Sequence, residues 1–270
     1  MPPEPSCKAW HSVSMHRRHA LVRRPSPRLA EGIVTHIERS DAVDADLAMR
    51  QWEGYVEALR AHGWETTEVE PVPDCPDGVF IEDAAVVYGD VAVLCRSGAP
   101  ERRAERRGVA EALTAQGYRL AEITEPGTLD GGDVLKHDGT VWVGLGGRTN
   151  EAGVTQLAAA FEPLGARVVG VPLTKVLHLK SAVTALPDGT IVGYEPLVDD
   201  PASWERFEAV PEEPGSHVVL LDADTVLMST SAPQTAQRFA NRGLRVVAVD
   251  LTEFEKLEGC VTCLSIRLRG

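Results

Sequence analysis

The chain has 270 residues, of which 43% are hydrophobic and 25% are charged, and its formal net charge is −13 at pH 7. This composition is typical of a soluble globular protein, and the length allows one large domain or two small ones. The negative charge argues against nucleic acid as a partner, because phosphate binding needs a basic face. Since no apolar run approaches the roughly 18 residues of a membrane span, we expect no membrane partner either.

The chain holds five cysteines, an odd number at dispersed positions, which does not suggest the disulfide framework of a secreted protein. Cys260 and Cys263 form a single Cys-x-x-Cys motif, but a zinc site needs further soft ligands, so we expect no metal. Residues 1–19 are polar and lack the apolar segment of a secretion signal. We therefore predict a flexible extension over 1–19, a single domain over 20–270 and a cytoplasmic location.

The hydrophobic pattern alternates between period-two strands and helical spacing along the whole predicted domain. Asp138-Gly139 and Gly89-Asp90 supply turn signals between adjacent strands. The predicted strands are, in chain order, residues 20–23, 65–69, 79–88, 91–95, 118–123, 133–136, 140–145, 167–171, 178–186, 191–194, 218–222, 226–228, 244–249 and 263–269. The predicted helices are residues 44–62, 102–116, 150–161 and 233–241, with a less clear helical stretch over 199–209.

A unit of strand, strand, helix and strand thus recurs about every 50 residues, close to five times, which is typical of a repeat architecture. One strand stands alone at each end of the array. The strand at 263–269 would complete the unit that begins with the strand at 20–23, and the array would close into a ring. The alternative is an ordinary α/β sandwich with one mixed sheet.

The first polar loop lies where a buried strand should begin. Asp77 precedes Gly78 and can simply start a turn. Glu82 and Asp83 follow Val-Phe-Ile and precede Ala-Ala-Val-Val, so an acidic pair interrupts an apolar run. Carboxylates inside a buried strand need partners, which a cationic ligand or internal salt bridges would supply equally well.

Two further stretches place polar groups beside predicted strands. Asp130 and Asp133 flank the pair Gly131-Gly132, which permits tight backbone bending. They form either an ordinary turn or a carboxylate directed at a substrate. His178 alternates with apolar neighbours, and a lone histidine in a strand is more often a hydrogen-bonded structural residue than a catalyst.

Arg96 and Arg148 each follow a predicted strand, where they form either surface ion pairs or a clamp for a carboxylate. Cys263 stands at the entrance of the last strand, either as a small buried side chain or as a nucleophile with a distant partner. A cysteine, a histidine, carboxylates and arginines are together what nucleophilic attack on a guanidinium carbon requires. The sequence does not show that they meet in space.

Six of these stretches, in the same order along the chain, resemble the dimethylarginine dimethylaminohydrolase family, which belongs to the pentein superfamily of guanidino-group-modifying enzymes. Each motif is weak alone, but the six together are specific and span most of residues 20–270. The motifs are 76–83 (PDGVFIED), 96–103 (RSGAPERR), 129–133 (LDGGD), 147–150 (GRTN), 177–180 (LHLK) and 262–265 (TCLS).

The resemblance implies an α/β fold, a five-bladed pentein propeller of repeated ββαβ modules with pseudo-fivefold symmetry. It also implies a hydrolase that converts Nω-methylated arginine, a small-molecule substrate, to citrulline and methylamine or dimethylamine through a covalent cysteine intermediate. The family needs no cofactor and no metal, and a homodimer is compatible with it.

The resemblance also assigns roles to single residues. It implies that Cys263 is the nucleophile, that His178 is the general acid and base, and that Asp130 lies against both the guanidinium and the histidine. Cys260 departs from the family pattern, so we expect it to be a bystander, although it could form a disulfide with Cys263 under oxidation. The implied substrate contacts are Asp77, Glu82 and Asp83, with Asp83 as the main partner of the guanidinium. Arg96 and Arg148 are implied to bind the substrate carboxylate. Ile33 is implied to contact the substrate from a lid loop, and Leu257 through its backbone carbonyl.

Three alternatives stay open at this point. The chain could be another guanidine-modifying enzyme of the same fold, an arginine deiminase or an amidinotransferase. It could be a non-catalytic protein that binds arginine-like ligands. A zinc hydrolase that uses His178 and the acids is a weaker option, because the sequence lacks H-E-x-x-H and paired Cys-x-x-Cys spacing.

Overall fold

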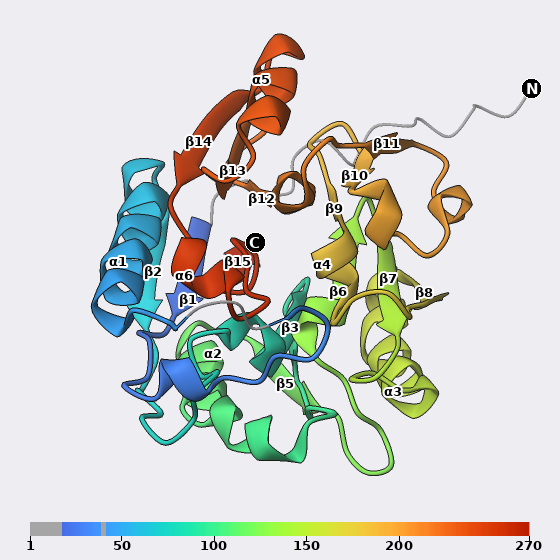
Figure 1. The fold of residues 1–270 in the computed structure, drawn as a ribbon. Coiled ribbons are helices and arrows are strands. Elements are labelled where there is room, and N and C mark those ends of the chain that lie inside the picture. The colour runs from blue at the N-terminus through green and yellow to red at the C-terminus, as the bar shows by residue number, and fades with distance from the viewer. Residues whose placement is uncertain (1–17, 39–41, 270) are drawn as a thin grey trace, which may run out of the picture.

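The computed structural model describes residues 18–38 and 42–269, which form five separate three-stranded sheets (Figure 1). In each sheet the middle strand pairs antiparallel with one neighbour and parallel with the other. The first sheet joins both ends of the chain, because β1 (Arg18–Val22) lies between β15 (Ser265–Arg269) and β2 (Glu65–Glu68). The predicted pairing of the two terminal strands is therefore confirmed.

The other four sheets follow one another along the chain, as the predicted recurrence of short units requires, and the alternative of one mixed sheet is wrong. Their strands are β3 (Ala85–Tyr88), β4 (Val91–Leu94) and β5 (Arg119–Glu122); β6 (Val134–His137), β7 (Thr140–Leu145) and β8 (Arg167–Pro172); β9 (Val183–Ala185), β10 (Ile191–Gly193) and β11 (Phe207–Ala209); and β12 (Val219–Leu220), β13 (Thr225–Ser229) and β14 (Arg245–Val249).

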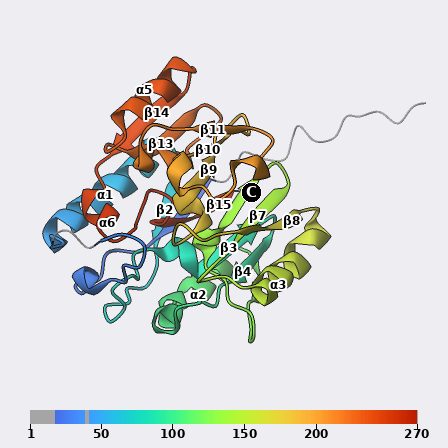
Figure 2. The ribbon, with the colours of Figure 1, turned by 45° about the vertical axis from the view of Figure 1, so that its right-hand side comes forward.

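Helices connect the parallel strands of four sheets and lie toward the periphery (Figures 1 and 2). The longest, α1 (Ala45–Ala61), begins where the Asp44 side chain accepts a hydrogen bond from the Leu47 N–H, and one apolar face is buried. The others are α2 (Val109–Ala115), α3 (Glu151–Phe161) and α5 (Pro233–Asn241). Short 3₁₀ turns at 195–197 and 201–203 take the place of a helix between β10 and β11.

The apolar core is divided into clusters that each join two successive units. One cluster packs Leu21 and Leu268 of the first sheet against Val87 and Leu113 of the second unit. Another packs side chains of α1 against Leu227 of β13, and so joins the fifth unit to the first. Among the described residues, none of the helices has the length and apolar character needed to span a bilayer.

Several predicted boundaries are wrong at places that carry polar side chains. The predicted strand over 79–88 is strand only in β3, because residues 81–84 form a 3₁₀ turn. The predicted helix over 102–116 is divided at Gly108, whose φ of +75° ends a 3₁₀ helix before α2 begins. The stretch 199–209 ends in β11 rather than in a helix.

The strand predicted over 178–186 begins instead with a helical turn, α4 (Leu179–Ala182), and only β9 is extended. The last strand begins at Ser265, so Cys263 lies in the turn before it. A short helix, α6 (Thr252–Glu255), precedes that turn and was not predicted. Helical turns in place of strand starts set successive side chains about 100° apart rather than on opposite faces of a sheet, and this positions the polar groups described next.

Candidate active site

A small cavity of about 20 Å³ brings together residues that are far apart in the sequence. Seven of the predicted site residues line it. Its lining consists of Ile33, Asp77, Phe80, Asp83, Arg102, Arg148, Leu177, His178, Leu257, Glu258 and Cys263.

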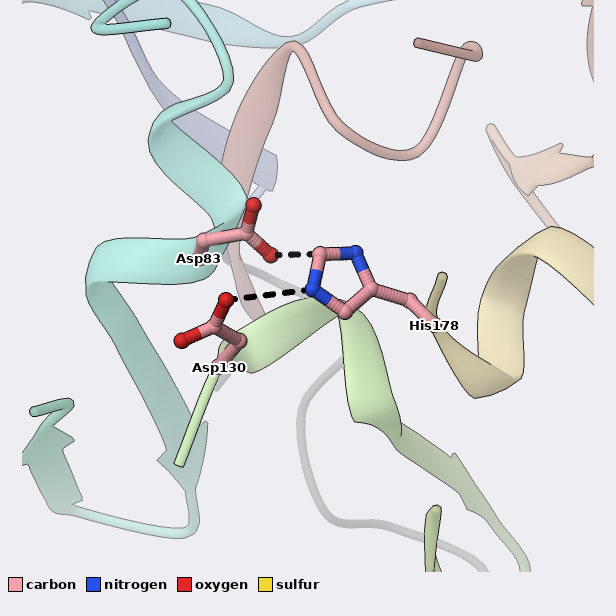
Figure 3. Close-up of side chains that lie close together, drawn as sticks. All are labelled: Asp83, Asp130 and His178. Atoms are coloured by element: carbon pink, nitrogen blue, oxygen red, sulfur yellow. Dashed lines mark hydrogen bonds and ion pairs between the residues drawn. The ribbon is translucent and has the colours of Figure 1, made fainter. Parts of the chain in front are cut away.

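His178 lies at the N-terminus of α4, and its buried imidazole is held by two carboxylates (Figure 3). Its Nε2 atom lies 3.1 Å from Asp130 Oδ2, and its Nδ1 atom lies 3.9 Å from Asp83 Oδ1. Burial alone would lower the pKa of His178, but the charge of Asp83, the hydrogen bond with Asp130 and the charge of Asp133 raise this pKa to about 9. At neutral pH the ring is therefore an imidazolium that can donate a proton.

The Gly131-Gly132 pair allows this approach for a steric reason. A Cβ atom on Gly132 would lie 2.6 Å from His178 Nδ1 and 2.7 Å from Asp83 Oδ1. A Cβ atom on Gly131 would lie 2.0 Å from the Glu82 carbonyl oxygen. Only glycine fits at either position, so the turn that carries Asp130 can pack directly against the histidine.

Asp130 is fully buried and also accepts hydrogen bonds from Arg148 Nη1 at 3.3 Å and from the Gly98 N–H at 3.3 Å. The neighbouring Asp133 accepts from Thr149 Oγ1 at 2.6 Å and from the Leu179 N–H at 3.0 Å. Burial raises the pKa of Asp133 to about 7. Asp133 thus supports the first turn of α4, while Asp130 contacts the catalytic candidate directly.

Asp83 is held by groups on two sides. The Gly132 N–H donates to Oδ1 at 2.8 Å, and Arg102 Nη1 donates to Oδ2 at 2.8 Å. Burial opposes ionisation, but the charges of His178 and Arg102 and these hydrogen bonds lower the pKa of Asp83 below its usual range. Asp83 is therefore a stable carboxylate on the cavity wall.

Arg102 is a site residue that the sequence reasoning missed. Its Nη2 atom also lies 2.7 Å from Oε2 of Glu105, and both side chains are buried. Burial raises the pKa of Glu105 to about 7. Arg102 stands in a charged run, Glu-Arg-Arg-Ala-Glu-Arg-Arg, that is typical of a solvated helix face. The signal that could have identified it is its place in the motif over 96–103.

A loop covers the cavity and is fixed at two points. The Ile33 N–H donates to both oxygens of Asp77, at 3.2 and 3.1 Å, and burial raises the pKa of Asp77. Further along the loop, the N–H groups of Thr35 and Ile37 donate to the carboxylate of Glu258 at 3.0 and 3.1 Å. Glu258 adopts a φ of +60° and was also missed, because an acid before a glycine is an ordinary turn signal.

Cys263 lies in the turn before β15 with only 8% of its surface exposed. Its N–H donates to the Cys260 carbonyl at 3.1 Å, and its own carbonyl accepts from the Glu82 N–H at 3.1 Å. The two sulfur atoms lie 3.4 Å apart. The hydrogen bond between them lowers the pKa of Cys260 to about 5 and raises that of Cys263, so the pair holds one proton over a wide pH range.

Three of the predicted site residues do not line the cavity: Asp130, Glu82 and Arg96. Asp130 contacts His178, which does line it. Glu82 faces a separate cavity of about 280 Å³, where its Oε1 atom lies 2.5 Å from both Lys180 Nζ and Arg267 Nη2. Arg96 donates to the Gly127 carbonyl at 3.1 Å and pairs with Glu125. The structure therefore brings together Cys263, His178, Asp130, Asp83, Asp77, Arg148, Ile33 and Leu257, whereas the side chains of Glu82 and Arg96 are engaged elsewhere.

The arrangement suits acid–base and nucleophilic chemistry better than metal binding. Asp83, Asp130 and His178 each offer one ligand atom within 4.8 Å of the others. A metal ion would have to displace a proton from His178, because these carboxylates raise the pKa of its imidazole to about 9. A thiol, an imidazolium and ionised carboxylates around one cavity can bind a planar cation and transfer a proton to its leaving group.

Comparisons with known proteins show relatives that match most of the chain. A family model described as "N,N dimethylarginine dimethylhydrolase, eukaryotic" matches residues 30–185. The chain is 64% identical over 255 residues to N(G),N(G)-dimethylarginine dimethylaminohydrolase of Streptomyces coelicolor, covering 94% of this chain and 98% of the relative. It is 30% identical to the protein of the same name from Pseudomonas aeruginosa, covering 93% and 99%.

The fold is similar to solved structures as well. A crystal structure of a mutant of the Pseudomonas aeruginosa protein, complexed with citrulline, matches with a TM-score of 0.87 at 28% identity. The match covers 93% of this chain and 99% of that one.

Proposed function

The chain belongs to the dimethylarginine dimethylaminohydrolase family, and from this premise we propose that it hydrolyses asymmetric dimethylarginine and monomethylarginine to L-citrulline and dimethylamine or methylamine. The observation that carries the proposal is the convergence of Cys263, His178 and Asp83 on one cavity. These three groups supply a nucleophile, an acid and an anion for the guanidinium.

Substrate binding begins with the charge on the guanidinium. Asp83, ionised beside Arg102, is the main partner of this cation, and Asp77 is a second partner. Arg148 lies on the cavity wall, where it binds the substrate carboxylate. Arg96 lies next to this region, since the Leu129 N–H donates to its carbonyl, and it joins the clamp by exchanging Glu125 for the substrate carboxylate.

The remaining contacts concern the backbone and the loop. Leu257 directs its carbonyl to the substrate, and Ile33 covers it from the loop. A cavity of about 20 Å³ holds roughly one water molecule, so the loop must move away before a substrate of arginine size can enter. Glu82 acts through the backbone, because its N–H donates to the Cys263 carbonyl.

The first chemical step forms a covalent intermediate. The Cys263 sulfur attacks Cζ of the guanidinium, and a carbon–sulfur bond forms. The nearby cation favours the thiolate on Cys263 rather than on Cys260, because positive charge lowers a thiol pKa. His178 then donates its proton to the departing amine, the carbon–nitrogen bond breaks, and an S-alkylthiouronium remains on Cys263.

The second step uses the same histidine in its neutral form. His178 removes a proton from water as the water oxygen attacks the same carbon. The carbon–sulfur bond breaks and the hydroxyl group of the adduct loses its proton to solvent, where the released amine takes up a proton. Citrulline is released, and the thiolate and the imidazolium are restored. Asp130 keeps the ring oriented through both steps, since it accepts from Nε2 in either state.

For the fold, the proposal is a closed five-bladed propeller with pseudo-fivefold symmetry. Three observations support it: five sheets of equal strand number, apolar clusters that each join two successive units, and a last cluster that joins the fifth unit to the first. The sheets also follow one another around the middle of the molecule (Figure 1). The predicted extension over 1–19 is too long by two residues, because Arg18 and His19 belong to β1, and its first 17 residues lie outside the described part of the chain. A single domain, a homodimer and a cytoplasmic location stay predictions.

The assay that tests the function measures citrulline release from arginine, monomethylarginine, asymmetric dimethylarginine and symmetric dimethylarginine, each at several concentrations. We expect the highest kcat/KM for asymmetric dimethylarginine and monomethylarginine. Preference for arginine with release of ammonia would instead indicate a deiminase. Turnover that requires an added amine acceptor would indicate an amidinotransferase, and binding without citrulline would indicate a non-catalytic protein.

A further inference from the structure

Cys260 and Cys263 are placed by one tight turn so that their sulfur atoms touch. The Cys263 N–H donates to the Cys260 carbonyl at 3.1 Å, and this hydrogen bond closes a four-residue turn. The Cα atoms at the two ends of such a turn lie within about 7 Å, the range that a disulfide spans. The sulfur atoms, 3.4 Å apart, need to approach by only about 1.4 Å to reach bonding distance. A disulfide here requires no rearrangement of the surrounding strands.

The other described cysteines lie in different surroundings. Cys95 is buried in the cluster between the second and third units, and its sulfur faces the carbonyl of Val93. Burial is the first cause that raises the pKa of Cys95, and also of Cys75. These two thiols are therefore inert packing groups, and Cys95 provides a matched control for experiments on the pair.

The protonation state of the pair also suits oxidation. The Cys260 sulfur lies 3.3 Å from Thr262 Oγ1 in addition to its contact with Cys263. The contact between the sulfur atoms lowers the pKa of Cys260 and raises that of Cys263, so the pair loses its first proton from Cys260 and keeps the other on Cys263. A thiolate is the form that reacts with peroxides, and an adjacent thiol is the group that resolves the product.

We propose that Cys260 and Cys263 form a reversible disulfide that inactivates the enzyme, with a hydroperoxide as the oxidant. The inactivation, but not the disulfide itself, rests on the proposed role of Cys263 as the nucleophile. Cys260 is the resolving thiol. Because it lies next to Cys263, oxidation of Cys263 ends in a disulfide, which can be reduced again to the free nucleophile.

The reaction balances with hydrogen peroxide alone. Peroxide enters the cavity that Cys263 lines, which holds about one molecule of this size. Cys263 first passes its proton to the Cys260 thiolate across the 3.4 Å contact between the sulfur atoms. The Cys263 thiolate then attacks one oxygen, the oxygen–oxygen bond breaks, and hydroxide leaves as a sulfenic acid forms. Cys260, losing its proton, then attacks the Cys263 sulfur and expels the second hydroxide. The two sulfur atoms lose two electrons, the two oxygen atoms gain them, and two waters form.

A dithiol reductant reverses the reaction by thiol–disulfide exchange. Without Cys260, the sulfenic acid on Cys263 stays exposed to more peroxide and proceeds to the sulfinic acid, which a dithiol does not reduce. The reversibility of inactivation therefore depends on the neighbouring thiol, whereas the loss of activity depends on Cys263.

The test compares reduced wild-type protein with the variants Cys260→Ser and Cys95→Ser. Each is treated with hydrogen peroxide and then with dithiothreitol, and each is assayed for citrulline release relative to its own untreated sample. Peptide mapping after blocking of free thiols identifies the oxidised species. For wild type and Cys95→Ser, we expect a peptide that has lost two hydrogens through a bond between Cys260 and Cys263, loss of at least nine-tenths of the activity, and recovery with dithiothreitol. For Cys260→Ser, we expect sulfinic acid on Cys263 and no recovery.

The outcomes separate the disulfide from the proposed function. If wild-type protein inactivated by peroxide contains no bond between Cys260 and Cys263, the proposal is overturned; this mapping is decisive even where Cys260→Ser fails to fold. Recovery of Cys260→Ser to the wild-type extent would also overturn it. A quantitative disulfide with full remaining activity would overturn the inactivation and, with it, the role of Cys263 as nucleophile.

Discussion

The Nε2 atom of His178 lies 3.1 Å from Oδ2 of Asp130, and both side chains are buried. The carboxylate cannot be screened by solvent at this position, so it stabilises the protonated ring strongly. Together with Asp83 and Asp133, it keeps the pKa of His178 near 9 although burial opposes the charge. The histidine therefore begins the reaction as an acid.

This pKa predicts the alkaline side of the pH profile. The imidazolium is present below about pH 9 and is lost as the pH rises through that value. We expect kcat/KM for asymmetric dimethylarginine to fall above about pH 9 in wild type, because kcat/KM reports the ionisations of the enzyme without substrate. In Asp130→Asn the pKa of His178 falls because one carboxylate charge is lost, so the decline should begin at lower pH. If the rate of Asp130→Asn declines at the same alkaline pH as that of wild type, a group other than His178 controls the decline.

Gly132 predicts a steric effect on the same histidine. In Gly132→Ala, the new methyl group would lie 2.6 Å from His178 Nδ1 and 2.7 Å from Asp83 Oδ1, so one of the two must shift. Since a displacement of about 1 Å at a catalytic group can lower the rate about 100-fold, we expect kcat to fall by roughly that factor. The control is Gly54→Ala in α1, which has no atom within 4 Å of the new methyl and should keep wild-type kcat. Equal rates in the two variants would contradict the packing described for Gly132.

The buried ion pairs of Arg102 predict that its substitution lowers the free energy of unfolding. Arg102→Met leaves Asp83 and Glu105 as buried carboxylates without their cation, which should lower the free energy of unfolding by about 3–5 kcal/mol at pH 7. The matched control is Arg119→Met, because its partner Asp90 forms an ion pair whose side chains are 65% and 61% exposed. Urea unfolding should show a much smaller loss there, because solvent and salt screen an exposed ion pair. A similar small loss in both variants would mean that Arg102 does not stabilise the carboxylates.

The contacts of Glu258 predict that its substitution changes how often the loop over residues 33–37 opens. Its carboxylate accepts hydrogen bonds from the N–H groups of Thr35 and Ile37, and these charge-assisted bonds hold the loop over Cys263. Glu258→Gln removes the charge but keeps an acceptor, which should weaken the closed state by about 1–2 kcal/mol and speed alkylation of Cys263 by iodoacetamide about tenfold. Glu31→Gln, at an exposed ion pair, should leave that rate unchanged. Alkylation as slow as in wild type would indicate that the loop is fixed by Asp77 alone.

The amphipathic elements could be predicted from the sequence because their period is local. The helix predicted over 44–62 is α1, since a capping aspartate and one apolar stripe define it without reference to the rest of the chain. The pairing of β1 with β15 could also be anticipated, because an apolar strand at each end of a repeat array needs a partner. The site chemistry followed from residue types and from a family resemblance, and the structure shows that most of these residues meet.

The directions and contacts of several side chains could not be predicted, because they depend on local turns and tertiary packing rather than on a periodic sequence pattern. Glu82 and Asp83 are adjacent acids, yet the 3₁₀ turn directs one to Lys180 and the other to His178. Arg102 looks like part of a solvated charged run, and only the packing of its helix against Asp83 buries it. Spacing places Cys260 near Cys263, but the sulfur contact depends on the turn that joins them.

The role of Cys263 as nucleophile is tested most directly by acid quench of the enzyme during turnover of asymmetric dimethylarginine, followed by peptide mapping. We expect an adduct on Cys263 that carries the arginine-derived amidino group, forms in wild type and is absent from Cys263→Ser, which should release no citrulline. An adduct on Cys260, or citrulline release by Cys263→Ser at near wild-type rates, would contradict the proposed mechanism.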